Sequence, residues 1–254
     1  MQTYNRLLEI RARRGAGYIV LIDPDKLSLQ ESVKLAMRAE QEDADIIFIG
    51  GSLLSTPIFD ELVRQVKAAV KIPVIIFPGG VQQISRHADA ILFMSVISGR
   101  NPDLLIGQHV MGAPIVKMLN LEAIATGYML IESGKMTSAE FMSNTKPIPR
   151  DKPQIAVAHA LAAEYLGMKL IYLEAGSGAL QPVPDEMIQA VAAGCSLPII
   201  VGGGIRTPEV AQQKAKAGAS FIVTGNVLEK KTKEGLIREF AGAIHQEKFA
   251  QSIN

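Results

Sequence analysis

The chain has little that would mark a secreted or membrane-spanning protein. It contains one cysteine, Cys195, and no tryptophan among its 254 residues. A single cysteine excludes an intrachain disulfide, so a reducing cytoplasm is the expected compartment. No apolar run reaches the roughly 18 residues of a membrane span, since even the stretch 113–131 contains Lys117 and Glu122. The basic N-terminus lacks the apolar segment of a signal peptide.

Charge of either sign is not in excess. The 26 Lys and Arg residues nearly balance the 25 Asp and Glu residues, which gives a formal net charge of +1 and none of the global field typical of nucleic-acid binders. We therefore expect small-molecule partners and at most peripheral membrane contact. The length is that of one α/β barrel, and no linker or low-complexity tract interrupts it. The prediction is a single domain over residues 1–254.

Short β-branched runs bounded by turn residues alternate with helical patterns. Eight runs predict buried strands: Tyr18–Ile22, Asp45–Ile49, Val74–Phe77, Ala90–Met94, Tyr128–Ile131, Lys169–Leu173, Pro198–Val201 and Ser220–Val223. Helices are predicted over Leu29–Gln41, Pro57–Val70, Pro102–Gly112 with a possible continuation, Pro153–Leu166, Pro184–Ala193, Pro208–Lys216 and Leu228–His245. Eight such units favour a closed (β/α)8 TIM-like barrel of the α/β class.

Two segments depart from the regular pattern. Residues 78–88 join the third and fourth strands and are too few for a crossover helix with its loops, so that helix is predicted to be irregular or missing. Residues 133–152 are polar, contain Pro147 and Pro149 and have no clear period, which is typical of a long loop or lid.

Glycine clusters follow the last two strands. They are Gly202-Gly203-Gly204 and Thr224-Gly225-Asn226. In (β/α)8 barrels these two loops commonly bind a phosphate through backbone N–H groups, although glycines also form plain tight turns. Their occurrence at successive strand ends favours a phosphorylated ligand.

Carboxylates and hydroxyls follow the first two strands. Asp23-Pro24-Asp25-Lys26 ends the first, and Gly50-Gly51-Ser52 ends the second. One or two protein carboxylates, completed by water and phosphate oxygens, are the usual ligands of Mg²⁺. Acidic residues at a helix N-terminus and ordinary turn chemistry are the alternative explanations. Arg100, after the fourth strand, is either a ligand of a diphosphate or a solvated loop charge.

The loop after the sixth strand is the densest polar segment of the chain. It runs Tyr172-Leu173-Glu174-Ala175-Gly176-Ser177-Gly178. Glu174 can take a proton or bind hydroxyl groups, and Gly-Ser-Gly offers N–H groups to an anion. The four histidines share neither a strand end nor the spacing of zinc ligands, and no Ser/His/Asp arrangement is present.

Taken together, these strand ends carry a resemblance. The segments are Leu21–Lys26, Ile47–Ser52, Phe77–Gly79, Ser98–Pro102, Tyr172–Gly178, Val201–Arg206 and Thr224–Asn226. In combination the chain resembles the geranylgeranylglyceryl phosphate synthase family and its heptaprenylglyceryl phosphate synthase relatives over nearly its whole length. No one of these segments is specific by itself.

The resemblance implies a substrate pair and a cofactor. Such an enzyme forms an ether between geranylgeranyl diphosphate and the primary C3 hydroxyl of sn-glycerol 1-phosphate, releases diphosphate and uses Mg²⁺. By position, Asp23 and Ser52 would be the metal-site residues. Glycerol phosphate would be held by Tyr172, Leu173, Glu174, Ala175, Gly176, Ser177, Gly178, Gly202, Gly203, Gly225 and Asn226.

Two further expectations follow from the same likeness. Relatives that use the heptaprenyl donor are expected to carry a lysine shortly before the first strand's aspartate, where this chain has Leu21, so the geranylgeranyl donor is favoured. The family also suggests a homo-oligomer, and helix residues such as Leu104, Leu105, Val110 and Met111 offer an apolar interface.

The residue types agree with alkyl transfer. An allylic diphosphate leaves only if its charge is neutralised, which a metal on Asp23 would do with help from Arg100. Glu174 is the candidate to orient the glyceryl hydroxyl and take its proton, and Tyr172 either positions the glycerol or stabilises the forming cation. A thin wall at 78–88 would give the lipid tail an apolar exit.

Two other functions are compatible with the glycines alone. One is another phosphate-binding barrel enzyme, an isomerase or lyase, which would need an acid/base pair acting on carbon that the other strand ends do not offer. The second is a non-catalytic barrel that binds a phosphorylated metabolite, which would have no reason to keep both Asp23 and Glu174.

Overall fold

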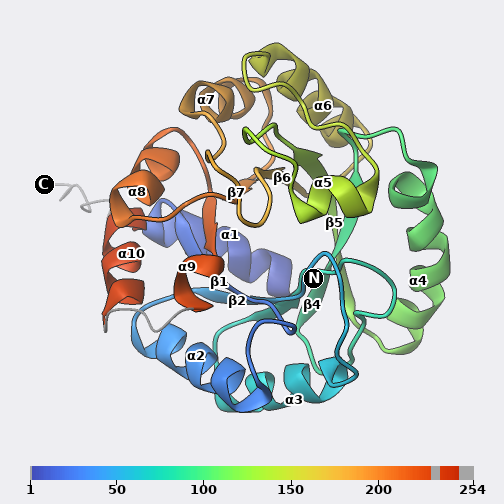
Figure 1. The fold of residues 1–254 in the computed structure, drawn as a ribbon, viewed down its shortest axis with the longest axis vertical. Coiled ribbons are helices and arrows are strands. Elements are labelled where there is room, and N and C mark those ends of the chain that lie inside the picture. Colours follow the sequence, from blue (N-terminus) through green and yellow to red (C-terminus); the bar gives the residue numbers. More distant parts are fainter. Residues whose placement is uncertain (1, 230–234, 246–254) are drawn as a thin grey trace, which may run out of the picture.

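The computed structural model describes residues 2–229 and 235–245, and it contains a closed parallel barrel. The strands are β1 (Gly17–Ile22), β2 (Ile46–Ile49), β3 (Val74–Ile76), β4 (Ala90–Val96), β5 (Glu122–Leu130), β6 (Leu170–Glu174), β7 (Ile199–Gly202) and β8 (Phe221–Thr224). They pair in sequence order, and β8 closes the ring on β1, with Gly17 opposite Phe221 (Figure 1). The predicted (β/α)8 fold is confirmed.

Helices surround this ring (Figure 1). They are α1 (Gln2–Arg14), α2 (Leu29–Gln41), α3 (Phe59–Ala69), the π-helical turn η1 (Asp103–Gly107) that leads into α4 (Gln108–Met118), α5 (Ser138–Ser143), α6 (Pro153–Tyr165), α7 (Asp185–Gly194), α8 (Pro208–Lys216), α9 (Asn226–Glu229) and α10 (Leu236–Ile244). The α2 helix begins at a capping box in which the Ser28 hydroxyl accepts the N–H of Glu31 and the Glu31 carboxylate accepts the N–H of Ser28. Among the described residues no helix has both the length and the apolar character needed to cross a bilayer.

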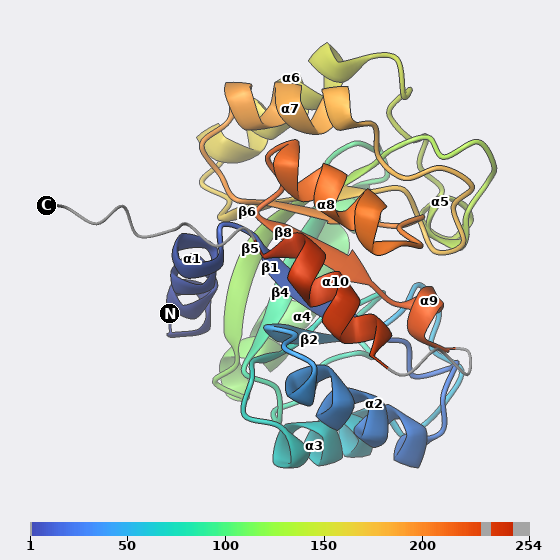
Figure 2. The ribbon, with the colours of Figure 1, turned by 90° about the vertical axis from the view of Figure 1, so that its left-hand side faces the viewer.

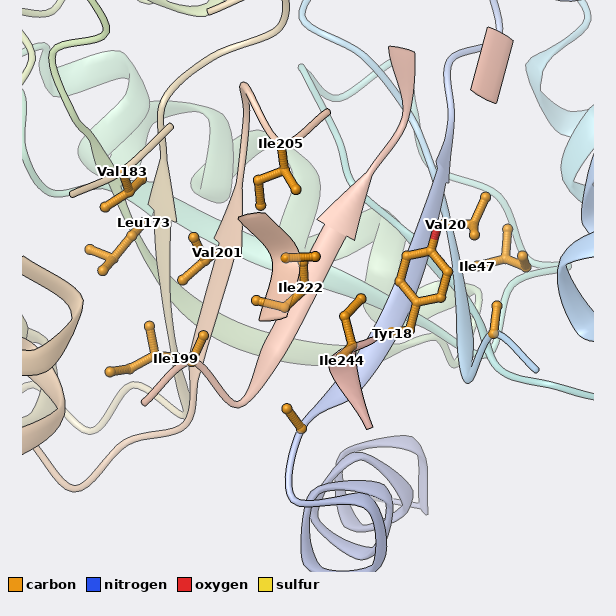
Figure 3. Packing of buried hydrophobic residues seen from close by; sticks show 14 of the residues in the cluster. Tyr18, Val20, Ile47, Leu173, Val183, Ile199, Val201, Ile205, Ile222 and Ile244 are labelled. Atoms are coloured by element: carbon orange, nitrogen blue, oxygen red, sulfur yellow. The ribbon is translucent and has the colours of Figure 1, made fainter. Parts of the chain in front are cut away.

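Alternate strand residues face two separate cores. On β2, Ile46 and Phe48 point into the barrel interior, whereas Ile47 and Ile49 pack under the helices. Figure 3 shows part of the outer core, with Tyr18, Val20 and Ile222 labelled, and the Tyr18 ring stacks on Phe240 of α10 at 5.9 Å. Because both faces of each strand are buried, the strands read in the sequence as continuous apolar runs.

The barrel is closed at one end by α1, an element that the sequence did not reveal. Leu7 and Ile10 pack into the interior core, and the Glu122 carboxylate accepts the backbone N–H groups of Thr3 and Tyr4 at 2.8 and 3.1 Å. Figure 2 shows α1 at one end of the barrel and the loops with α5 and α9 at the opposite end. A ligand site at the carboxyl ends of the strands is therefore open only on the α5 and α9 side.

Two predicted elements differ from the structure by more than two residues. Strand β5 begins at Glu122 rather than Tyr128, because residues from Glu122 onward pair with β4. The possible continuation of the predicted helix Pro102–Gly112 is confirmed, since α4 ends at Met118. The predicted helix Leu228–His245 is instead α9 and α10, and residues 230–234 lie outside the described part of the chain.

The predicted missing helix is confirmed. No helix is present between β3 and β4, where residues 77–89 form turns and bends. Gln83 organises this connection: its side-chain Oε1 accepts the N–H groups of Gly51 and Gly79 at 3.3 and 3.2 Å, and its Nε2 donates to the Gly51 carbonyl at 2.8 Å. The side chain is fully buried, yet its polar atoms are bonded, which avoids the cost of burying an unpaired amide.

Candidate active site

A cavity of about 850 Å³ occupies the carboxyl-terminal end of the barrel. Its lining comes from the loops after β1, β2, β3, β6, β7 and β8, together with α4 and α5. Asp23, Ser52, Glu174, Gly203 and Asn226 all lie on its wall. The structure thus brings together residues that are separated by as many as two hundred positions in sequence.

One half of the cavity is built around Glu174 and glycine backbone. The Glu174 Oε1 accepts the N–H of Gly176 at 2.6 Å, and the N–H of Ala175 donates to the Gly202 carbonyl at 3.0 Å. Gly203 has a φ of +82°, and a Cβ there would lie within contact distance of Glu174 Oε1 and 2.6 Å from the Gly176 nitrogen. Only glycine therefore allows the β7 loop to approach the Glu174 carboxylate.

The remaining predicted glycerol phosphate residues fall into two groups. Gly176, Ser177, Gly178, Gly225 and Asn226 line the cavity. The Ser177 hydroxyl donates to Asn226 Oδ1 at 3.2 Å, which joins the β6 and β8 loops into one surface. Leu173 and Ala175 point their side chains into the outer core, so they can offer a ligand only their backbone.

Glu174 is the titratable group of this half. It is 6% exposed, and burial raises the pKa of its carboxyl to about 7, against the opposing effects of the Gly176 N–H and the nearby Tyr172 hydroxyl. A carboxyl with a pKa near neutrality exchanges protons readily at physiological pH, which is the property required of a general base.

Asp23 and Ser52 form the other polar half. The Asp23 side chain faces the β2 loop, since a Cβ on Gly51 would lie 3.1 Å from Asp23 Oδ1. Burial raises the pKa of the Asp23 carboxyl, and the N–H of Asp25 donates to its Oδ1 at 3.0 Å. One carboxylate and one hydroxyl beside an open cavity match the donor set of Mg²⁺ in phosphate-handling enzymes, in which substrate oxygens supply further ligands.

Asp25 has a different role from its neighbour Asp23. Its carboxylate accepts the backbone N–H groups of Ser55 and Thr56 at 2.8 to 3.1 Å and so holds the loop before α3. In the loop after β1, Asp23 therefore faces the cavity, whereas the Asp25 carboxylate is bonded to backbone. Glu229, which sequence reasoning missed, also lines the cavity, and burial followed by the nearby Asp23 charge raises the pKa of its carboxyl.

An apolar arm of the cavity runs between the β3–β4 connection and α4. It is lined by Val81, Ile84, Phe93, Gly112 and Val116, among others. A Cβ on Gly112 would lie 3.6 Å from both Val81 and Ile84, so the connection packs closely on α4 where a crossover helix would otherwise stand. The arm exists because that helix is missing.

The polar segment 133–152 forms part of the cavity wall. Its short helix α5 places Ser138, Ala139 and Met142 on the lining, and Ile148 pairs with Ile131 at the end of β5. Thr137 caps α5 by accepting the N–H of Glu140, and its side chain covers Gly176, whose Cβ would clash with it. The segment thus covers the glycine loop of β6.

Arg100 does not lie on the cavity wall. Its guanidinium Nη1 donates to the Gly99 carbonyl at 2.6 Å, and the side chain is exposed. Lys26 and Arg206 do line the cavity, and the Arg206 guanidinium is held by the Ala179 and Leu180 carbonyls. The predicted contact of Arg100 with a diphosphate stays a prediction, and Lys26 is the cation nearer to Asp23.

This geometry agrees with the relationships of the chain. The sequence pattern of the PcrB family matches residues 8–244. The chain belongs to the PcrB family. It is 51% identical to a geranylgeranylglyceryl phosphate synthase of Chitinophaga pinensis, with 95% of both chains covered, and 46% identical to one of Flavobacterium johnsoniae, with 89% of this chain and 93% of that one covered.

A solved relative extends the PcrB-family assignment to the fold. The crystal structure of (S)-3-O-geranylgeranylglyceryl phosphate synthase from Thermoplasma acidophilum, in complex with sn-glycerol-1-phosphate, matches with a TM-score of 0.90 and 35% identity. The match covers 96% of this chain and 99% of that one. The barrel fold is therefore shared with that synthase.

The close packing of Gly203 against Glu174 leads to a first prediction. Replacing Gly203 with Ala should lower the affinity for sn-glycerol 1-phosphate more than about tenfold, because the new methyl group would displace Glu174 and the β6 loop. Isothermal titration calorimetry measures the change. Gly242→Ala in α10 is the matched control, since a Cβ there meets nothing within 4 Å. Equal binding by both variants would show that the ligand does not contact the β7 loop.

Proposed function

We propose that this chain joins geranylgeranyl diphosphate to the primary C3 hydroxyl of sn-glycerol 1-phosphate, forming an ether and releasing diphosphate. The main observation behind this proposal is that the buried carboxyl of Glu174 lies between a glycine-lined polar half and an apolar arm of one cavity. A phosphorylated polyol suits the first and a prenyl chain suits the second. The name of the relatives and the glycerol phosphate in the Thermoplasma enzyme support the same acceptor.

The acceptor is positioned by backbone groups. The phosphate is proposed to accept hydrogen bonds from backbone N–H groups of the β6, β7 and β8 loops. The short helix α9, which begins at Asn226, adds the positive end of its dipole. With the phosphate held there, the far hydroxyl of glycerol reaches Glu174. An isomerase or lyase would need a second acid or base besides Glu174, and Asp23, Lys26 and Glu229 also line the cavity. The transferase is preferred because of the apolar arm and the name of the relatives.

Bond changes follow from this placement. The ionised Glu174 carboxylate takes the proton of the glyceryl hydroxyl as the oxygen attacks C1 of the prenyl chain. The bond between C1 and the diphosphate oxygen breaks with both electrons going to the diphosphate. The products are the ether, protonated Glu174 and free diphosphate, and Glu174 then returns its proton to solvent.

Asp23 and Ser52 are proposed to hold Mg²⁺. The bound ion would neutralise the leaving diphosphate. Lys26, which lines the cavity on the same β1 loop, adds a fixed positive charge near the same oxygens. Asp25 keeps this loop in position, because its carboxylate accepts the backbone N–H groups of Ser55 and Thr56.

The surroundings of the cavity suggest two further properties. The apolar arm at the β3–β4 connection is proposed to carry the lipid tail out of the barrel. On α4, Val110 and Met111 are 66% and 62% exposed, and this apolar exposure supports the proposal that the chain forms a homo-oligomer. Leu104, expected on the same outer face, lines the cavity instead. The proposed cytoplasmic location rests on the single cysteine.

The function is tested by product analysis. Purified protein with Mg²⁺ and sn-glycerol 1-phosphate is incubated with farnesyl, geranylgeranyl and longer prenyl diphosphates, and the ether is identified by mass. We expect the geranylgeranyl ether to form with the highest kcat/KM. Binding of both substrates without any ether would indicate a non-catalytic barrel, and the absence of product with every donor would refute the synthase assignment.

A second prediction concerns the metal. Asp23→Asn should lower kcat about 100-fold and remove the response to added Mg²⁺, while calorimetry shows unchanged affinity for glycerol phosphate, because the acceptor is proposed to be held by backbone N–H groups and not by the Asp23 carboxylate. The exposed Asp151→Asn variant is the matched control. Full Mg²⁺-dependent turnover by Asp23→Asn would contradict the metal assignment.

A third prediction concerns pH. With a pKa of about 7, Glu174 is mostly protonated at pH 6, so kcat/KM should rise about tenfold per pH unit below pH 7 and level off above it. Glu174→Gln should lower the rate by a factor of about 10² to 10⁴. Dividing the wild-type rate by the residual variant rate cancels the ionisation of the substrate phosphate. A ratio that is constant from pH 5.5 to 9 would exclude Glu174 as the base.

The same shift predicts the pH dependence of stability. The folded state raises the pKa of Glu174 from 4.5 to about 7, so it binds the proton more tightly than the unfolded chain does. The free energy of unfolding should therefore be highest below pH 4.5, with respect to this group, and fall by about 3 kcal/mol as pH rises to 7. Glu174→Gln should raise the melting temperature at pH 8 and have little effect at pH 5.

A further inference from the structure

Three aromatic rings stand together on the floor of the cavity. Phe77 follows β3, Tyr128 lies in β5 and Tyr172 lies in β6, and all three line the cavity. The ring centroids of Phe77 and Tyr172 are 5.2 Å apart, those of Tyr128 and Tyr172 are 5.4 Å apart, and those of Phe77 and Tyr128 are 6.3 Å apart. We call this group the aromatic floor.

The aromatic floor lies directly beside the proposed base. A Cβ on Gly202 would lie 2.6 Å from the Tyr172 hydroxyl oxygen and 3.0 Å from Glu174 Oε2, so both groups face the same point of β7. The Glu174 charge also raises the pKa of the Tyr128 phenol, which places Tyr128 within electrostatic range of that carboxylate. On the other side, the floor continues into the apolar arm through Leu92 and Phe93.

This position is where the reacting carbon must lie. The acceptor hydroxyl is held at Glu174, the diphosphate is held at Asp23, and the prenyl tail extends into the apolar arm. C1 of the donor is bonded to the diphosphate and is attacked by the hydroxyl, so it lies between the two polar halves and over the floor. The substrate positions proposed above therefore bring the atom that gains positive charge next to the aromatic floor.

The rings contribute through their faces rather than through their hydroxyl groups as bases. Burial raises the pKa of both Tyr128 and Tyr172 well above the usual value, so both phenols stay neutral at physiological pH. Phe77, the ring that stacks on Tyr172, has no ionisable group at all. A neutral aromatic face attracts a cation through its quadrupole, and the attraction grows where water is excluded.

We propose that Phe77 and Tyr128 are catalytic residues which, with Tyr172, stabilise the allylic cation that forms at C1 as diphosphate leaves. The proposal rests on the prenyl transfer proposed above and assigns no new bond change. As the bond to diphosphate breaks, positive charge spreads over the allylic carbons above the floor. When the glyceryl oxygen adds and Glu174 takes its proton, that charge disappears.

Removal of single rings tests the proposal. Phe77→Leu and Tyr128→Leu should each lower kcat about tenfold or more, with less than about threefold change in the affinity for glycerol phosphate and for geranylgeranyl diphosphate. Tyr128→Phe keeps the face and should retain most of kcat. Phe48→Leu is the matched control, because the Phe48 ring stacks on Phe77 at 6.0 Å but does not line the cavity.

A graded change separates catalysis from packing. Incorporation of mono-, di- and trifluorophenylalanine at position 77 weakens the quadrupole in steps while nearly conserving ring shape, so log kcat should fall linearly with the number of fluorines. A flat series, or equal losses in Phe48→Leu and Phe77→Leu, would mean that the rings only pack, and the proposal would be overturned. Thermal melting of each variant shows whether it is folded.

The wild-type protein in the same assay separates this proposal from the proposed function. If the wild type forms no ether, both fail together. If it forms the ether and the fluorine series is flat, only the role of the aromatic floor is refuted.

Discussion

The Glu174 carboxylate is buried against backbone that only glycine leaves within reach, and the arrangement of the site follows from this contact. Its Oε1 bonds the Gly176 N–H, and Gly203 approaches at a positive φ that leaves no room for a Cβ. Burial of a charged form costs free energy, which is why the pKa rises to about 7. The Gly176 N–H is occupied by this bond, so the phosphate is proposed to be held by other backbone N–H groups of the glycine loops. The same packing constraint buries the Glu174 carboxyl and raises its pKa toward neutrality.

The missing crossover helix is the second constraint, and the barrel compensates for it with buried polar contacts. Gln83 bonds the backbone of Gly51 and Gly79, and the Ser85 hydroxyl donates to Asp60 of α3 at 2.7 Å. These bonds hold the β2 and β3 loops in the absence of a helix. The space along α4 then remains available as an apolar arm.

Local patterns predicted most of the fold. Most of the residues predicted for the site line the cavity, and the exceptions are Arg100, Leu173, Ala175 and Gly202. Strand number, barrel closure and the missing helix followed from apolar runs, their alternation and a connection of residues 78–88, all of which are short-range properties. The α1 helix escaped prediction because its Leu7 and Ile10 contacts lie with distant strands. Arg100 was expected on the cavity, but its guanidinium bonds the Gly99 carbonyl of its own loop. Gln83 and Glu229 carry no motif, and they are found only where the chain brings distant loops together.

Charge separation across the cavity connects these features. Acidic side chains lie on two sides of the cavity, with Glu174 on the β6 side and Asp23, Asp25 and Glu229 on the side of β1 and α9. The aromatic floor consists of neutral rings. A water-excluding floor strengthens the attraction between a transient cation and the acidic side chains on both sides, because the local dielectric constant is low. It also keeps solvent from reaching that cation before the glyceryl oxygen does. Polar side chains in place of the aromatic floor would admit water and weaken the attraction to the cation. This is a physical reason for the three aromatic side chains at the ends of β3, β5 and β6.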